Sequence, residues 1–267
     1  MDRPRERRWD VPAFRKRELQ RQSLCMAIGD VNNDGNLDIA VVNLFTGLQI
    51  ALGNGDGTFQ APMTYAAGSF PASVTLADFN KDGNLDAVVT NNGSGTISVF
   101  LGKGDGTFPR RVDYASGAGP NSAVAADFNG DGNLDLVEVN GGDGTIGLYL
   151  GNGDGTFGAE TPFPSNSGSG GIVSGDFNVD GKVGVVLLAG PNISVIAGNG
   201  DGTFRPPVEF GVGETAGSEA VVDINGDGAP DLVVTVHQTD FIPPQSTAKL
   251  CQNSEILWRA DSRRRMS

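Results

Sequence analysis

The sequence predicts an all-β repeat fold, a β-propeller of about five four-stranded blades. Two short strings recur along most of the chain at a period of about 47 to 49 residues, in phase with each other, and this period is typical of propeller blades. The segments between the strings are short, β-branched and bounded by Gly, Asn, Asp and Pro, which indicates strands. Glycine accounts for 40 of the 267 residues, and this density disfavours helix.

The first string is acidic and reads D-x-N-x-D-G-x-x-D. Full copies begin at Asp30, Asp78, Asp127 and Asp223, and a damaged copy begins at Asp176. The second string reads G-x-G-D-G-T-F and ends at Phe59, Phe108, Phe157 and Phe204. Because two independent motifs keep the same period, we interpret each period as one structural repeat.

Each repeat predicts four strands, as in a propeller blade. In the second repeat the strands are expected over residues 73–77, 86–90, 96–101 and 107–114. The blades then cover residues 23–68, 71–116, 120–164, 169–211 and a fifth from about 217. The fifth blade is degenerate, because no second string follows its strand over 232–236. Five blades either close into a small ring or form an arc of a larger one, and an arc would favour an oligomer.

Charge is distributed unevenly along the chain. Residues 23–240 contain 26 acidic and six basic residues, whereas both ends are rich in arginine. We therefore expect a flexible basic leader over 1–22, the repeats over 23–250 and a basic tail over 251–267. The acidic middle argues against a nucleic-acid partner, because phosphate binding needs the opposite sign. A divalent cation is the simplest partner for so many acids.

The acidic string has the oxygen donors of a Ca²⁺ site. The first, third and fifth side chains converge in one turn, glycine at position six permits the turn, the carbonyl at position seven faces inward, and the last Asp closes the shell. Hard oxygen donors favour Ca²⁺ over zinc and over Mg²⁺. The expected ligands, with position seven contributing its carbonyl, are Asp30, Asn32, Asp34, Asn36 and Asp38; Asp78, Asn80, Asp82, Asn84 and Asp86; Asp127, Asn129, Asp131, Asn133 and Asp135; and Asp223, Asn225, Asp227, Ala229 and Asp231.

Calcium is predicted to be structural, with about four good sites. Three neighbouring carboxylates repel one another unless a cation lies between them, so filling a loop stabilises the fold. The fourth loop keeps Asp176, Asn178 and Asp180 but has Lys182 at position seven and Gly184 at position nine. We expect it to bind weakly or not at all, and Lys182 could neutralise the two acids instead.

Both strings also have an interpretation without metal. The acidic string could form solvated turns, which Asp, Asn and Gly favour in any case, although four copies with identical ligand spacing favour the calcium site. For the second string the turn is the favoured interpretation. Its aspartates are expected to face water and its phenylalanine to anchor the sheet; these aspartates are Asp56, Asp105, Asp154 and Asp201.

The paired strings resemble the FG-GAP/VCBS repeats, the calcium-binding blades of integrin α-subunit propellers and of many bacterial surface proteins. The resemblance covers residues 23 to 236. It implies a β-propeller with Ca²⁺ in the loop that joins the first two strands of each blade, in an extracellular or cell-surface protein. Propellers of this family commonly have seven blades, so the five repeats here could be part of a larger ring.

The favoured function is ligand binding or adhesion, with calcium rigidifying the blades and a protein or a glycan as the ligand. No catalytic role is expected, and the fold by itself does not fix the ligand. A lectin would need exposed aromatic side chains between the blades. The candidates are Tyr65, Tyr114, Tyr149, Trp9 and Trp258.

The alternative function is a carbohydrate-active enzyme on a propeller scaffold. Acid catalysis would need carboxylates outside the acidic loops, such as Glu138, Glu160 or Glu219. Glu138 interrupts an apolar strand, and we expect it at an edge or facing solvent. The single histidine, His237, has no accompanying nucleophile motif, so the binding function remains favoured.

The two cysteines, Cys25 and Cys251, lie near opposite ends of the repeats. Two free thiols are expected, and the alternative is a disulfide that closes the ring. No apolar run is long enough to span a membrane. The residues after the basic N-terminus also lack the apolar stretch of a secretory signal.

Overall fold

The structure, a computed structural model, describes residues 23–165, 170–212, 215–226 and 230–237. These residues form eighteen β-strands and no helix, so the all-β prediction is confirmed. Within the same ranges there is accordingly no helix long and apolar enough to cross a membrane. The predicted basic leader and tail, together with Cys251, Trp9 and Trp258, lie outside the described residues.

The strands form four four-stranded antiparallel sheets and one two-stranded sheet, each in sequential order. The first two sheets are β1 (Ser23–Gly29), β2 (Asp38–Asn43), β3 (Gly47–Ala51) and β4 (Met63–Tyr65), then β5 (Pro71–Ala77), β6 (Asp86–Asn91), β7 (Thr96–Leu101) and β8 (Arg110–Ala115). The next two are β9 (Pro120–Ala126), β10 (Asp135–Asn140), β11 (Thr145–Tyr149) and β12 (Thr161–Pro164), then β13 (Ile172–Gly175), β14 (Gly184–Ala189), β15 (Asn192–Ile196) and β16 (Val208–Gly211). The last pair is β17 (Thr215–Val222) and β18 (Asp231–His237).

The sheets correspond to the repeats, and the propeller-like architecture predicted from them is confirmed. Three of the four strands expected in the second repeat match β5, β6 and β7 closely. The fourth begins at Arg110 rather than at Thr107. Thr107 is held in the preceding turn, because its N–H and its hydroxyl both donate to Asp105 Oδ1.

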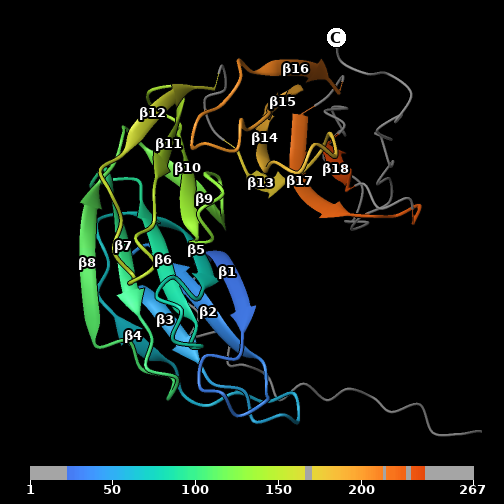
Figure 1. Cartoon of the computed structure of the whole chain (residues 1–267). Helices are drawn as coiled ribbons and strands as arrows, with labels where there is room; N and C mark the ends of the chain where they lie inside the picture. The colour runs from blue at the N-terminus through green and yellow to red at the C-terminus, as the bar shows by residue number, and fades with distance from the viewer. Residues whose placement is uncertain (1–22, 166–169, 213–214, 227–229, 238–267) are drawn as a thin grey trace, which may run out of the picture.

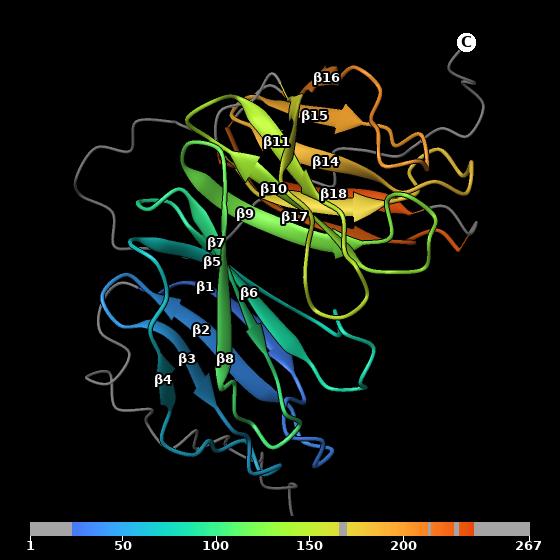
Figure 2. The same ribbon diagram turned by 60° about the vertical axis from the view of Figure 1, so that its left-hand side comes forward.

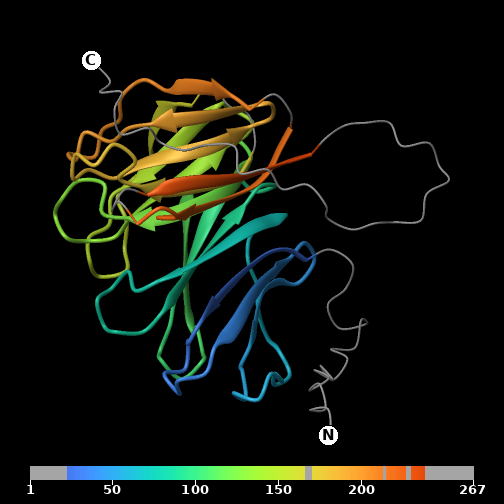
Figure 3. The same cartoon turned by 90° about the vertical axis from the view of Figure 1, so that its right-hand side faces the viewer.

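Successive sheets pack face to face along an arc (Figures 1 and 3). The first strands of neighbouring sheets, β1, β5, β9, β13 and β17, contact one another in that order. Figure 2 shows the first and second sheets below and the later ones above. The arrangement is that of propeller blades, and the sheets are called blades 1 to 5 from here on.

A separate apolar core fills each of the four junctions between neighbouring blades. At the junction of blades 1 and 2, for example, Leu48 and Ile50 of β3 pack against Val89 and Phe100 of blade 2. Blades 2, 3 and 4 thus bury one face against the preceding blade and the other against the following one. Stability comes from contacts between repeats more than from any one sheet, as in other repeat proteins.

A tyrosine and a phenylalanine join neighbouring blades in a repeated way. The ring of Tyr114, in β8, packs edge-on against Phe157 of the next blade at 5.8 Å between ring centres. The Phe157 N–H also donates to Tyr114 Oη at 3.1 Å. Tyr65 makes the same two contacts with Phe108 one junction earlier. At the next junction Phe163 packs against Phe204 without a hydroxyl.

Replacing Tyr114 with Phe should therefore lower the free energy of unfolding by about 1 to 2 kcal/mol, because the Phe157 N–H loses its acceptor while the ring packing is kept. Urea unfolding of the purified chain measures this. Phe163→Tyr is the matched control, since it adds a hydroxyl where the junction already folds without one. A Tyr114→Phe chain as stable as the wild type would show that the hydroxyl contributes nothing to the junction.

Candidate metal sites in the acidic loops

Each acidic loop connects the first two strands of its blade, and the first four loops curl through two left-handed residues. Glycine occupies position six with φ near +85°, as in Gly35 and Gly83. Position four is also left-handed, at Asn33 (φ 58°) and Lys81 (φ 59°). A Cβ at Gly35 or Gly83 would meet no other atom, so backbone conformation rather than space requires glycine there. The predicted role of this glycine is confirmed.

The side chains at positions one, three and five all fold into the loop. In the first loop Asp30 accepts the N–H groups of Asp34 and Gly35. Asn32 accepts the Asp34 N–H through Oδ1 and donates from Nδ2 to Asp34 Oδ2 at 2.9 Å. Asp34 accepts the N–H of Asn36. Loops two and three repeat this inward arrangement with small variations.

The aspartate at position nine has a second role that the sequence did not reveal. Asp135 is fully buried, and its two oxygens accept the N–H of Phe128 at position two and the N–H of Gly151 in the following turn, both at 2.9 Å. Asp38 and Asp86 make the equivalent pairs of hydrogen bonds. This carboxylate therefore fastens the acidic loop to the turn that contains the second string.

The residue at position two links the acidic loop to the next blade as well. The side chains of Val31, Phe79 and Phe128 are buried at 2% exposure. Their carbonyls accept an N–H from the second string of the next blade; the donors are Gly106, Gly155 and Gly202. Loop, turn and neighbouring blade are thus joined through one residue.

Burial raises the pKa of two of the position-nine carboxylates, Asp86 and Asp135. Desolvation raises the pKa of Asp86 to about 6, against the lowering effect of the Gly102 and Phe79 N–H groups, and the negative charges of Asp82 and Asp78 raise it further. Asp135 has a raised pKa for the same reasons. In contrast, backbone and side-chain hydrogen bonds lower the pKa of Asp82. The carboxylates at positions one, five and nine of a loop thus lie around a single turn and repel one another.

The donors of the loops fit a calcium ion in chemistry and number. The carboxylates at positions one and five and the amide at position three face inward, and each position-nine oxygen retains a lone pair beside its N–H bond. Within the described ranges no three acidic, imidazole or thiol side chains converge to hold a metal by themselves. The inward-facing oxygens of the loops accept hydrogen bonds from backbone N–H and side-chain amide groups. The predicted calcium shell also contains oxygens that are not acidic, namely the amide oxygen at position three and the carbonyl oxygen at position seven.

The fourth and fifth loops differ from the first three. In the fourth, a Cβ at Gly184 would lie 2.7 Å from the carbonyl oxygen of Ile196, so the backbone has closed into the space of the missing carboxylate. Arg205 lies 3.6 Å from Asp180, a contact not anticipated for the fourth loop. In the fifth, Asp231 again accepts the position-two N–H, while Asp227 and Ala229 lie outside the described residues.

The second string forms the turn expected of it. Asp56, in its first copy, is exposed and accepts the N–H of Thr58, and the other copies match. The first glycine of the string lets the turn approach the backbone of the acidic loop closely. A Cβ at Gly151 would lie only 2.1 Å from the Leu134 carbonyl oxygen. Phe108 and Phe157 are buried.

Glu138 lies where the sequence analysis did not expect it. It occupies an interior strand, β10, and its side chain is fully buried, so the expectation of an edge or exposed position was wrong. Oε1 accepts the hydroxyls of Ser116 (2.6 Å) and Tyr149 (2.7 Å), while Oε2 has no partner. Burial raises the pKa of Glu138 to about 7, opposed by these hydrogen bonds and helped by the charge of Glu160. The equivalent residues of blades 1 and 2, Val41 and Val89, are buried as well, so the repeat already indicated an interior position.

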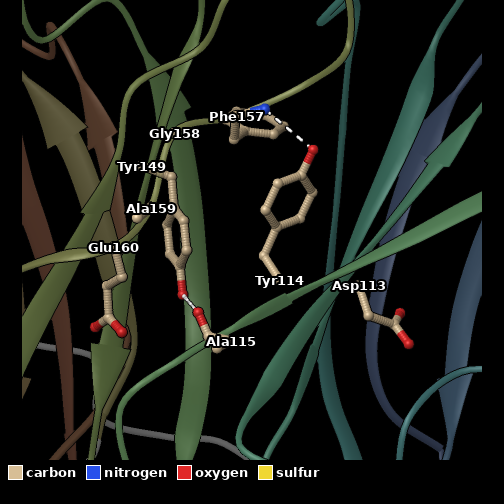
Figure 4. Close-up of a pocket in the computed structure, with 8 residues that line it drawn as sticks. All are labelled: Asp113, Tyr114, Ala115, Tyr149, Phe157, Gly158, Ala159 and Glu160. Carbon is tan, nitrogen blue, oxygen red and sulfur yellow. Dashed lines mark hydrogen bonds between the residues drawn. The ribbon is translucent and has the colours of Figure 1, made fainter.

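A pocket of about 460 Å³ lies beside this cluster, between blades 2 and 3. Figure 4 shows the rings of Tyr114, Tyr149 and Phe157 around it, with the Glu160 carboxylate on one side. Tyr149 is fully buried, and its single hydroxyl proton is shared between Glu138 Oε1 and Ala115 O. Tyr65 and Tyr114 are engaged with phenylalanines. These tyrosines are therefore not the freely exposed stacking surfaces that a lectin was expected to need.

Comparison with known families agrees with the repeat pattern. The model of the FG-GAP-like repeat matches residues 30–89, 78–138 and 180–234, which together cover more than half of the chain. No curated protein matches the sequence as a relative.

Several solved structures share the fold. A lectin of Agrocybe aegerita that recognises non-reducing terminal N-acetylglucosamine superposes with a TM-score of 0.59 and 24% identity, over 80% of this chain and 60% of the lectin. A functionally unknown protein of Desulfotomaculum acetoxidans gives 0.54 and 16%, over 79% and 68%. The rhamnogalacturonan lyase of Bacillus licheniformis gives 0.51 and 15%, over 80% and 47%. The chain thus spans about 60% of the lectin, and these likenesses concern the fold alone.

Asp135→Asn should destabilise the chain by about 1 to 3 kcal/mol even in the presence of chelator, because the amide replaces one acceptor of a buried N–H. The matched control is Asp131→Asn in the same loop, where the side chain is exposed and the metal-free fold should change little. Urea unfolding in chelator measures both variants. Equal effects at the two positions would contradict the separate structural role of position nine.

Stability should also depend on pH through Glu138. The pKa of Glu138 is about 7 in the folded chain, against 4.5 ordinarily. Between these two pH values the folded chain holds the proton more tightly than the unfolded chain, so its stability falls as the pH rises through this range. Relative to Glu138→Gln, which is neutral throughout, the wild type should lose about 2 to 3 kcal/mol between about pH 5 and pH 8. A difference between the two chains that is constant with pH would refute the buried-acid assignment.

Proposed function

The chain belongs to the FG-GAP-like repeat family, and from this membership we propose that it is a calcium-stabilised β-propeller that binds a protein or a glycan ligand. The observation that carries the proposal is the repeated inward arrangement of oxygen donors at positions one, three and five of the first three acidic loops. Solvated turns alone would not require the same ligand spacing in each blade.

Four loops would hold the ion. They use Asp30, Asn32, Asp34, Asn36 and Asp38, and the corresponding residues of the second, third and fifth loops. Bound calcium would supply positive charge where the carboxylates of each loop crowd together. The chain's own contribution is to hold the loop ready, because position nine already fastens it to the next turn. The fourth loop, with Gly184 at position nine, would contribute little.

An extracellular or cell-surface location is part of the proposal. Calcium sites of extracellular modules bind at about 10⁻⁴ to 10⁻³ M, and such sites would be filled where calcium is abundant. The acidic repeat region, with 26 acidic residues against six basic ones, supports a role away from nucleic acid.

The ligand class is proposed as protein or glycan. The Agrocybe aegerita lectin recognises N-acetylglucosamine, and a propeller can present a comparable surface between its blades. The likeness to a lyase shows that the same scaffold also hosts catalysis, so the fold does not decide between the two. The burial of Glu138, the first candidate for acid catalysis, supports the binding function.

Calcium should raise the melting temperature of the chain, and Mg²⁺ should raise it much less. At free Ca²⁺ about tenfold above its Kd each filled loop adds about 1.4 kcal/mol, so three or four loops should shift the transition by roughly 10 °C. Differential scanning calorimetry in calcium, magnesium and chelator measures this shift.

The matched control is the triple variant Asp34→Asn, Asp82→Asn, Asp131→Asn. These three side chains are exposed, so the variant should melt close to the wild type in chelator but respond to calcium far less. A wild-type melting temperature that is the same in calcium and in chelator would overturn the calcium proposal. A glycan array and a pull-down with calcium present then test for the ligand.

A further inference from the structure

The first two blade junctions place different charges at one equivalent position. In blade 2, Arg111 pairs with Phe100 across β7 and β8. The same register in blade 3 places Glu160 directly before β12, opposite Tyr149. At the first junction the Arg111 guanidinium crosses to the preceding blade and donates to Ala66 O at 2.8 Å.

At the second junction no guanidinium of the described residues occupies this place. Glu160 stands there, and the carbonyl equivalent to Ala66 O, that of Ala115, accepts the Tyr149 hydroxyl at 2.9 Å instead. The pocket of about 460 Å³ opens at this point, lined by Ala115, Tyr114, Tyr149, Phe157 and Glu160 among others (Figure 4). Space is thus present where the neighbouring junction holds an arginine side chain.

Glu160 supplies a carboxylate to the lining of the pocket, and the buried Glu138 lies behind it, outside the lining. Glu160 Oε1 accepts the Asn140 side-chain amide at 2.7 Å and lies against Gly147, where a Cβ would be only 2.2 Å from it. Gly147 pairs with Glu138 across β10 and β11, so both carboxylates lie on the face of blade 3 that packs on blade 2. Glu138 Oε2 is buried without a partner.

The pocket therefore combines the Glu160 carboxylate, a backbone carbonyl and aromatic walls. The second acidic residue of its lining, Asp113, is already paired with Arg111 at 2.7 Å. A guanidinium suits this set, because its planar N–H groups donate to carboxylate and carbonyl oxygens. An anionic ligand would face Glu160 directly. A neutral ligand would leave the carboxylate without a counter-charge.

We propose that the pocket between blades 2 and 3 binds a guanidinium group, the side-chain group of arginine, with Glu160 as its anionic partner. This site specifies the chemical group that the binding function proposed above would recognise. It rests on that proposed binding function and not on the binding of calcium. An arginine side chain of a partner protein and a free arginine-like molecule share this chemistry. The same position at the first junction is filled from within by Arg111.

The test titrates the full chain with N-acetyl-arginine amide and follows backbone amide resonances by NMR. N-acetyl-citrulline amide, which has the same shape without the charge, is the neutral probe. The arginine probe should shift resonances around Ala115, Tyr149 and Glu160, and the citrulline probe should bind at least about tenfold more weakly. An arginine-containing peptide, compared with free arginine, shows which source is preferred.

Glu160→Gln should weaken binding of the arginine probe about tenfold or more. Glu209→Gln is the matched control, because Glu209 is an exposed glutamate on the outer strand β16 of blade 4. Glu160→Arg should abolish binding by filling the pocket as Arg111 fills the first junction, and its amide spectrum reports whether the fold is kept. Equal binding of citrulline, or unchanged binding in Glu160→Gln, would overturn the proposal.

Each titration is run in calcium and in chelator. Binding of the arginine probe in both, without a calcium-dependent melting shift, would support the pocket and contradict the calcium loops. A calcium-dependent shift without arginine binding would do the reverse. Shifts spread over the whole acidic surface would show charge attraction only and would contradict a defined site.

Discussion

The buried carboxylate at position nine is the constraint on which blades 1 to 3 depend. Asp135 satisfies two backbone N–H groups that lie 23 residues apart in sequence, at Phe128 and Gly151, and so fixes the acidic loop against the second turn. The carbonyl of Phe128 continues the connection to Gly202 in the next blade. Burying a charge is costly unless its oxygens are hydrogen-bonded, and here both are. The loop therefore has its curvature before any ion is considered.

Differences between the junctions follow from single substitutions within this repeated frame. Tyr65 and Tyr114 bond to the following blade, whereas Phe163 packs only. At the first junction the Arg111 guanidinium contacts the preceding blade, whereas at the second junction Glu160 takes the equivalent position and a pocket lies beside it. Glu138 adds a buried acid where other blades have apolar residues. The repeated blades supply a stable scaffold. The positions at which one blade carries a different residue from the others are where a binding site can form.

Much of the fold could be predicted from the sequence, because the repeat period, the β-branched segments and the glycine turns all specify the same blade. The prediction for Phe108 as an anchor held for the same reason, since its motif recurs in phase. Contacts between blades could not be predicted, because they depend on which faces meet. The burial of Glu138 was not predicted for this reason: its strand was clear, but its partners are Ser116, just after β8, and Tyr149 in β11. The calcium ligands were chosen by spacing, which does not reveal that position nine already bonds to the backbone.

The central claim is that the acidic loops bind calcium, and counting the ions tests it most directly. Calorimetric titration of calcium into the chelator-treated chain gives the number of sites independently of any effect on stability. About four ions per chain are expected, and the same number in an Asp180→Asn variant, because the fourth loop lacks the position-nine carboxylate. Titration without measurable binding at millimolar calcium would contradict it and would leave the acidic strings as hydrogen-bonded turns.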